Sequence, residues 1–241
     1  MTDEIFRLWV YLSATPLAGL ALTLVAYTIA WGAYARSGFH PLANPVPIAV
    51  ALVVAALAAT RTPYATYFEG AQFVHFLLGP AVVGLAVPLA RDLANVRRLA
   101  GPIAVALVAG SATAAASAVA IAWALGVSPA TLLSLVPKSV TAPVAMGIAE
   151  RLGGLPALAA VFAVATGVLG AVIGRAVFDA AGVTDARARG FALGLAAHGI
   201  GTARAFQVDA TAGTWAGLAF GLHALIASFA LPVVVVALRG G

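Results

Sequence analysis

Charged residues divide the chain into long apolar stretches. Six intervals contain no Asp, Glu, Lys or Arg, and each is long enough to cross a bilayer as a helix. They are residues 8–35, 37–60, 70–90, 99–137, 152–174 and 210–238. A helix needs roughly 20 apolar residues to cross a hydrocarbon core about 30 Å thick. Stretches such as 46–59 lack the alternation of a transmembrane β-strand, so the pattern predicts membrane-spanning helices.

Five segments have the features of complete crossings. They are residues 8–35, 45–60, 101–126, 155–178 and 211–238. The other apolar segments contain residues that interrupt a helix. Gly79 and Pro80 lie in the middle of one, and Pro137 and Pro143 separate two short pieces of another. Proline lacks a backbone N–H and is better placed at the start of a helix than inside it. We therefore expect half-helices, which occur at membrane depth only where protein or a watery cavity surrounds them.

A third interruption lies around His198, inside a short helix predicted at residues 187–206. His198 and Thr202 are four positions apart, so they share a helical face and can line one cavity. Gly199 and Gly201 allow the backbone to bend or to approach a neighbour closely. This segment is the third candidate for a broken helix that contributes to a central polar site.

Some interruptions recur at matching places in the chain. Asn44-Pro45 and Ala142-Pro143 each open a short apolar helix, and Gly79 and His198 lie about half a chain apart. Transporters are often built from two inverted halves whose broken helices meet at the bilayer midplane. The spacing is compatible with two repeated halves, at about residues 1–120 and 121–241. It is equally compatible with a chance match between the interruptions.

Composition excludes an ordinary soluble enzyme. Hydrophobic residues make up 63% of the chain and charged residues 9%, against roughly 45–50% and 25% in soluble domains. The absence of cysteine excludes disulfides and thiolate metal sites. The net charge of +5 comes mainly from arginines at predicted span ends, which suits membrane interfaces and not nucleic acid. The predicted fold class is all-α, a polytopic transmembrane helix bundle with broken or re-entrant helices, in one domain over residues 1–241.

The sequence contains a single lysine, Lys138. It lies in one of the predicted breaks, beside Ser139 and Thr141. A cation at the middle of a bilayer costs on the order of 2.5–3.5 kcal/mol, so its retention suggests an anionic ligand. The two hydroxyls and the N–H groups of the helix that starts near Pro143 would add hydrogen-bond donors. In the alternative interpretation, Lys138 marks a helix end and extends outward to the interface.

Other ionisable residues are weaker candidates. His198 titrates near neutral pH and could carry a coupling proton, as could Glu69 if burial raises its pKa. Glu69 could instead cap a helix at the interface. Arg204 and Asn44 are secondary site candidates, and Arg204 could instead form an interfacial ion pair. His75 and His223 have no polar neighbours in the sequence, so we expect both to be structural. No motif for nucleophilic catalysis, phosphate binding or metal binding is present, and we expect neither enzyme activity, nor a cofactor, nor a metal.

With these residues in view, the chain resembles the LrgB/CidB family. The resemblance rests on four strings that occur in the family's order, across about residues 40–235. They are Leu78–Leu89, Pro137–Ala145, Gly153–Leu158 and Ala188–Ala203. The Pro-Lys-Ser-Val-Thr and His-Gly-Ile-Gly-Thr-Ala sequences within them are specific.

The resemblance implies a multi-pass protein of the bacterial inner membrane, similar to part of the plant plastid glycolate/glycerate translocator. It implies either a proton-coupled transporter of small monocarboxylates (glycolate, glycerate or pyruvate), which is the main hypothesis, or an antiholin-like or holin-like regulator of murein hydrolase export and cell lysis. Expected partners are the carboxylate, a proton, lipid, an LrgA-like small membrane protein and further copies of the chain, as a homodimer or higher oligomer. The site residues that match the family are Lys138, Ser139, Thr141, His198, Gly199, Gly201 and Thr202.

Overall fold

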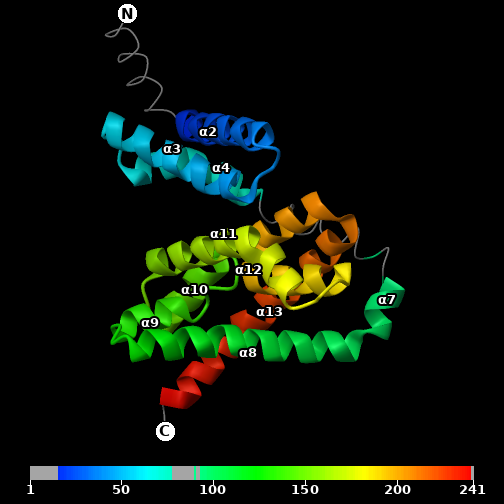
Figure 1. The fold of residues 1–241 in the computed structure, drawn as a ribbon. Coiled ribbons are helices and arrows are strands. Elements are labelled where there is room, and N and C mark those ends of the chain that lie inside the picture. Colours follow the sequence, from blue (N-terminus) through cyan, green and yellow to red (C-terminus); the bar gives the residue numbers. More distant parts are fainter. Residues whose placement is uncertain (1–15, 78–89, 91–92, 240–241) are drawn as a thin grey trace, which may run out of the picture. The chain divides into compact units, whose positions relative to one another are not determined.

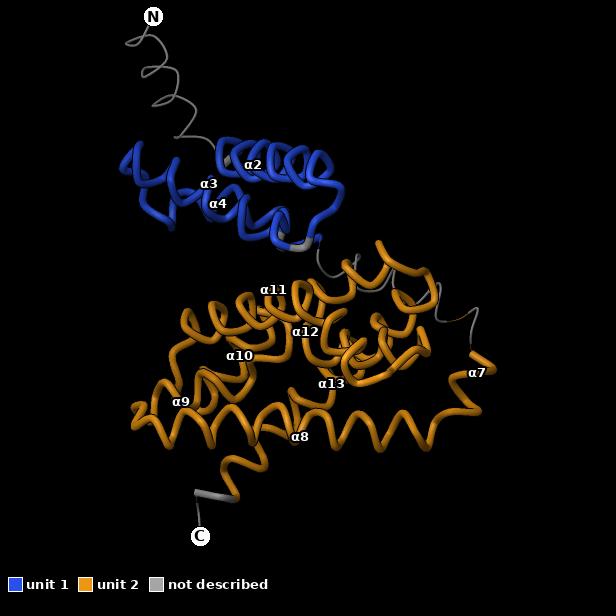
Figure 2. The backbone as a smooth tube through the Cα atoms, in the orientation of Figure 1, with its two compact units in different colours: residues 1–83 blue, residues 84–241 orange. Residues whose placement is uncertain are grey.

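The computed structural model describes residues 16–77, 90 and 93–239, and the regular secondary structure of these residues is helical (Figure 1). Ten α-helices and one short 3-10 helix lie within them. The predicted all-α fold class is confirmed. The chain separates into two compact units, residues 1–83 and residues 84–241 (Figure 2).

Unit 1 is a small cluster of helices around α2. Its described helices are α2 (Pro16–Arg36), the 3-10 helix η1 (Pro41–Ala43), α3 (Pro45–Thr60) and α4 (Tyr64–Phe76). α2 packs against both α3 and α4. A Cβ atom at Gly19 of α2 would lie 2.2 Å from the carbonyl oxygen of Tyr67, and the hydroxyls of Thr23 and Tyr67 are 2.8 Å apart. Glycine therefore allows α2 and α4 to touch through their backbones.

Unit 2 contains the remaining helices. They are α7 (Leu93–Arg98), α8 (Ala100–Ala124), α9 (Pro129–Leu135), α10 (Ala142–Leu152), α11 (Pro156–Ala180), α12 (Ala186–Val208) and α13 (Ala210–Arg239). α12 packs against α13 and α11, while α10 contacts α11 and α13. In Figure 1, α8 runs along one side of this unit. A buried apolar cluster that includes Leu107, Leu195 and Leu218 joins α8 to α12 and α13.

Small residues allow α12 to approach α13 closely. A Cβ atom at Gly190 or at Gly194 would lie 2.1 Å from the carbonyl oxygen of Ala212 or of Ala216, respectively. A step of four residues along α12, from Gly190 to Gly194, matches a step of four residues along α13. The first half of α12 therefore runs parallel to the start of α13. Close backbone approach through glycine and alanine is the usual way in which helices associate in lipid, where the hydrophobic effect between them is absent.

Four of the five predicted crossings are helices long and apolar enough to span a membrane. They are Leu17–Arg36, Ala100–Ala124, Pro156–Ala180 and Ala210–Ala237. The fifth, α3, has 16 residues and is shorter than the roughly 20 needed. Asn44 begins it as N-cap, accepting a hydrogen bond from Val46 N–H at 2.9 Å, and Arg61 ends it in the left-handed region. Asn44, a secondary site candidate, therefore has a capping role in unit 1.

Two of the three predicted interruptions are confirmed. α9 and α10 have 7 and 11 residues and are separated at residues 136–141, and α12 has non-helical backbone angles at His198. The third interruption, at Gly79 and Pro80, lies outside the described residues. The short lengths of α9 and α10 agree with half-helices that do not cross the membrane alone.

Asp185 starts α12 as its N-cap. Its carboxylate accepts hydrogen bonds from the N–H groups of Arg187 and Ala188 at 2.8 and 3.1 Å. The Arg187 side chain, together with the Ala188 N–H, holds the pKa of Asp185 at about 2. The negative charge at this end favours the helix because it faces the positive end of the helix dipole.

Candidate functional site

The turn between α9 and α10 is anchored by a buried serine. Ser134, on α9, is 0% exposed. Its hydroxyl donates to the carbonyl of Ala130 at 2.7 Å and accepts from the N–H of Leu155 at 2.7 Å. The second bond ties α9 to the chain just before α11, so the turn that follows α9 has a defined place in unit 2. No pattern in the sequence marks Ser134 as a site residue.

Lys138 lies in this turn and is partly buried. Its ammonium donates a hydrogen bond to the hydroxyl of Ser139 at 3.2 Å, and Ser139 itself is buried. Thr141 is the N-cap of α10 and makes no side-chain capping bond, and Pro143 occupies the first turn. The predicted lysine, two hydroxyls and helix N-terminus therefore meet in one turn, where unpaired N–H groups at the start of α10 favour an anion.

His198 lies inside α12, at the residue where the helix is interrupted, and is buried. Its φ of 42° and ψ of −133° are rare for a residue with a side chain. The imidazole Nε2 donates to the carbonyl of Ala163 on α11 at 2.8 Å, because a carbonyl can only accept. A Cβ atom at Gly167 would lie 2.8 Å from this ring, so α11 needs glycine there to admit the imidazole. His198 is thus held on α11 by one hydrogen bond and close packing.

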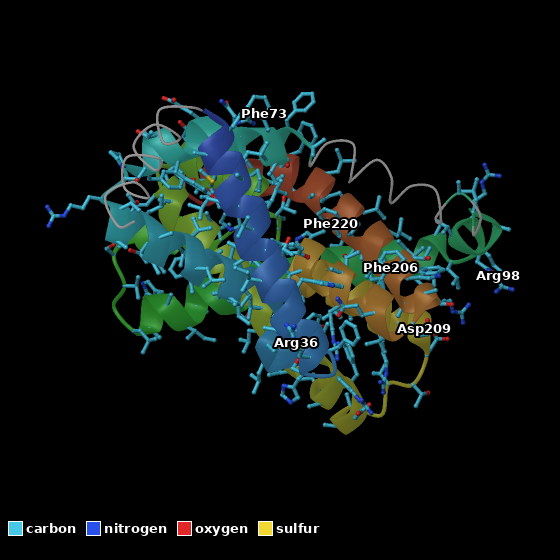
Figure 3. All side chains as sticks on the ribbon, turned by 90° about the horizontal axis from the view of Figure 1, so that it is seen from above. Arg36, Phe73, Arg98, Phe206, Asp209 and Phe220 are labelled. Carbon is cyan, nitrogen blue, oxygen red and sulfur yellow. The ribbon has the colours of Figure 1, made fainter. Side chains whose placement is uncertain are left out.

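The chain folds back at His198. Arg189 and Arg204 line the same pocket of about 460 Å³. In a straight helix at about 1.5 Å per residue these two residues would lie about 22 Å apart. The predicted interruption is therefore a reversal, and residues 186–197 and 199–208 are two half-helices that face one another. Figure 3 shows Phe206 and Asp209 near the end of the second half.

Of the two glycines beside His198, one has an expected role and neither makes the bend. The positive φ lies at His198, and neither Gly199 nor Gly201 has one. A Cβ atom at Gly199 would meet nothing within 4 Å, whereas one at Gly201 would lie 2.7 Å from the carbonyl oxygen of Leu193. Thr202 donates its hydroxyl to the carbonyl of His198 at 2.8 Å and so supports the break. Close approach at Gly201 is confirmed, but the bend itself belongs to the histidine.

We expect His198→Gly to be more stable than His198→Ala by about 1 kcal/mol. Alanine would keep the backbone strain, worth about 1–3 kcal/mol, whereas glycine relieves it and loses about 0.4–1 kcal/mol through the greater freedom of its unfolded chain. Both variants lack the imidazole, so thermal unfolding in detergent isolates the backbone effect. Ala197→Gly, at an ordinary helical position, is the control and should lower stability. Equal or reversed stabilities of the two His198 variants would contradict the strained backbone.

His223 connects the two breaks. It lies on α13, is buried, and donates from Nδ1 to the carbonyl of Leu195 on α12 at 3.0 Å. It also lines one small cavity together with Ser139 of the α9–α10 turn, and it lies close enough to His198 and Lys138 for their charges to interact. From the sequence we expect His223 to be structural, because it has no polar neighbours in the chain. Its position inside the apolar run of α13 was a usable signal, because an ionisable residue within a membrane span is a functional candidate by default.

Arg204 lies in a different pocket of unit 2. Arg204 shares its pocket with Arg175, Arg189, Asp179 and Asp209, and its guanidinium donates to Gln207. Arg189 pairs with Asp179, which leaves this pocket with mixed charge. Glu69 is exposed on α4 in unit 1, and its role in proton coupling stays a prediction.

Comparison with known proteins identifies the family. The model of the LrgB-like family matches residues 23–237. This chain belongs to the LrgB-like family. The predicted resemblance is confirmed, and two of the strings that carry it, Pro137–Ala145 and Ala188–Ala203, coincide with the two breaks of this LrgB-like protein. Together with the four apolar helices, the family establishes a multi-pass bacterial membrane protein.

Three relatives show how far the similarity extends. The Bacillus subtilis protein YwbG, described as uncharacterized, is 34% identical over 216 residues, which cover 90% of this LrgB-like chain and 96% of the relative. The holin-like protein CidB of Staphylococcus epidermidis is 27% identical over 216 residues, or 90% and 94% of the two chains. The antiholin-like protein LrgB of Bacillus mycoides is 26% identical over 219 residues, or 91% and 95%. No solved structure matches the chain.

Proposed function

We propose that this protein controls the permeability of the bacterial cell membrane as a holin-like or antiholin-like protein. The observation that carries the proposal is the similarity, over 90% of the chain, to a relative named holin-like and, over 91%, to one named antiholin-like. In this role the protein regulates murein hydrolase export and cell lysis together with an LrgA-like small membrane protein. The exposed apolar side chains of α8 and α13, which include Val105 and Phe229, offer surfaces for lipid or for further subunits.

Release of a trapped dye from liposomes tests this proposal. We expect the rate of dye release to increase more than linearly with the number of protein copies per liposome, because several copies would have to assemble. Dye release should show no saturation when small carboxylates are added. A parallel series with an LrgA-like protein measures whether the partner suppresses or promotes release. Absence of release at every density, with and without the partner, would contradict the permeability role.

The second candidate is proton-coupled transport of a small monocarboxylate such as glycolate, glycerate or pyruvate. One observation favours it: Lys138, Ser139, His198 and His223 meet inside unit 2 at two broken helices. A membrane protein without a solute site has no need of such a costly polar cluster. A lysine beside a half-helix N-terminus is suited to an anion, because both supply positive charge and N–H donors.

Uptake of radiolabelled glycolate into the same liposomes separates the two functions. A transporter should show saturable uptake that a pH gradient, acid outside, increases. A permeability regulator should show linear flux that follows dye release. Glycolate uptake that neither saturates nor responds to the gradient would remove the transport hypothesis and leave the first proposal standing.

A further inference from the structure

Unit 2 contains a small, partly open cavity next to the broken helices. Its volume is about 40 Å³, and it lies between α8, the turn from α9 to α10, and α13. Three polar residues contribute to its lining, namely Ser111 of α8, Ser139 of the turn and His223 of α13. The other lining residues are apolar or small. The cavity is therefore a mostly apolar pocket between membrane helices, into which three polar residues also face.

The hydroxyl of Ser111 needs a hydrogen-bond partner that the described protein groups do not provide. The hydroxyl oxygen is buried, and no other group in the described part of the chain bonds to it. A buried hydroxyl without a partner costs about 1–3 kcal/mol. One water requires a cavity of about 10–15 Å³ and two to four polar partners. The volume and the three polar residues meet both requirements, so the pocket has room for one or more waters.

We propose that this cavity is a water-filled proton-exchange site and that His223 is the group that gains and releases the proton. The Nδ1 of His223 is committed to the carbonyl of Leu195, which keeps its N–H. Nε2 is then the nitrogen that takes a proton from the water and returns it. His198, the residue expected from the sequence to carry the proton, does not line this cavity. The assignment does not depend on which of the two functions above is correct.

Protonation of His223 would change the electrostatic potential near two other basic side chains, those of Lys138 and His198. Lys138 faces His223 from the α9–α10 turn and His198 faces it from α12. α8 contributes Ser111 and carries no charged or histidine residue between 100 and 124. Lys138 donates to the hydroxyl of Ser139, which lines the cavity with His223. Protonation of His223 would therefore place a second positive charge beside Lys138 and increase the attraction of this region for an anion.

Solid-state NMR of the full chain in liposomes, with ¹⁵N-labelled histidine rings, tests the proposal. We expect a cross-peak between water and the His223 ring, and a change in the His223 ring nitrogen shifts as the pH is lowered from about 8 to about 4. His198 is the internal reference, because Nε2 is held by Ala163 and its ring lies outside the cavity. The signals are assigned from those lost in His223→Gln and His198→Gln.

Ser111→Val should fill the cavity and abolish the water cross-peak of His223 while leaving the His198 signals in place. Ser117→Val, on the exposed side of α8, is the matched control and should leave both unchanged. If Ser111→Val does not fold, Ser111→Ala removes the hydroxyl without added bulk and should weaken the cross-peak. A dry His223 ring in the unmodified protein, an unaltered cross-peak in the folded Ser111 variant, or constant ring shifts over this pH range would overturn the proposal.

Discussion

Gly194→Ala should destabilise unit 2 by about 3 kcal/mol or more. The added Cβ atom would lie 2.1 Å from the carbonyl oxygen of Ala216 and 2.6 Å from its carbonyl carbon and Cα. These are backbone atoms, so no rotamer change relieves the overlap, and α12 must move away from α13. The expected result is a much lower thermal unfolding midpoint in detergent, with loss of a single sharp peak on gel filtration.

Gly221→Ala is the control for this prediction. Gly221 lies on α13, and a Cβ atom there would meet nothing within 4 Å. Alanine at a helical position is favoured over glycine by about 1 kcal/mol, so this variant should be as stable as the parent or slightly more stable. Equal midpoints for Gly194→Ala and Gly221→Ala would show that α12 and α13 do not meet through their backbones.

Lys138→Ala should reduce saturable glycolate uptake by about 100-fold if the transport proposal is correct. The variant removes the ammonium of the α9–α10 turn and its hydrogen bond to Ser139. It should not destabilise the protein, because a partly buried ammonium is costly at membrane depth. A loss of uptake with unchanged or higher stability would therefore indicate a functional role and not a folding defect.

Two comparisons make the Lys138 experiment decisive. Lys138→Arg keeps the positive charge and should retain part of the uptake, although its planar guanidinium has a different shape. Dye release should be the same in the unmodified protein, in Lys138→Ala and in Lys138→Arg if release depends on assembly of apolar surfaces. Uptake that is unaltered in Lys138→Ala would eliminate the proposed role of this lysine.

The sequence alone determined the helical membrane architecture. The predicted segments 101–126, 155–178 and 211–238 correspond to α8, α11 and α13 within about two residues at each end. Pro137 and Pro143 correctly located one break, and His198 another. These predictions succeeded because a helix in lipid must satisfy its own backbone hydrogen bonds, so its length and interruptions depend on local residues.

The tertiary structure decided what these elements do together. The reversal at His198, the backbone contact between Gly194 and Ala216, and the approach of His223 to Ser139 all join residues that are distant in the sequence. No local pattern specifies such pairs, because whether a histidine or glycine faces lipid, a neighbouring helix or a cavity depends on how the helices pack. The sequence supplied the polar groups, and packing brought them to one place.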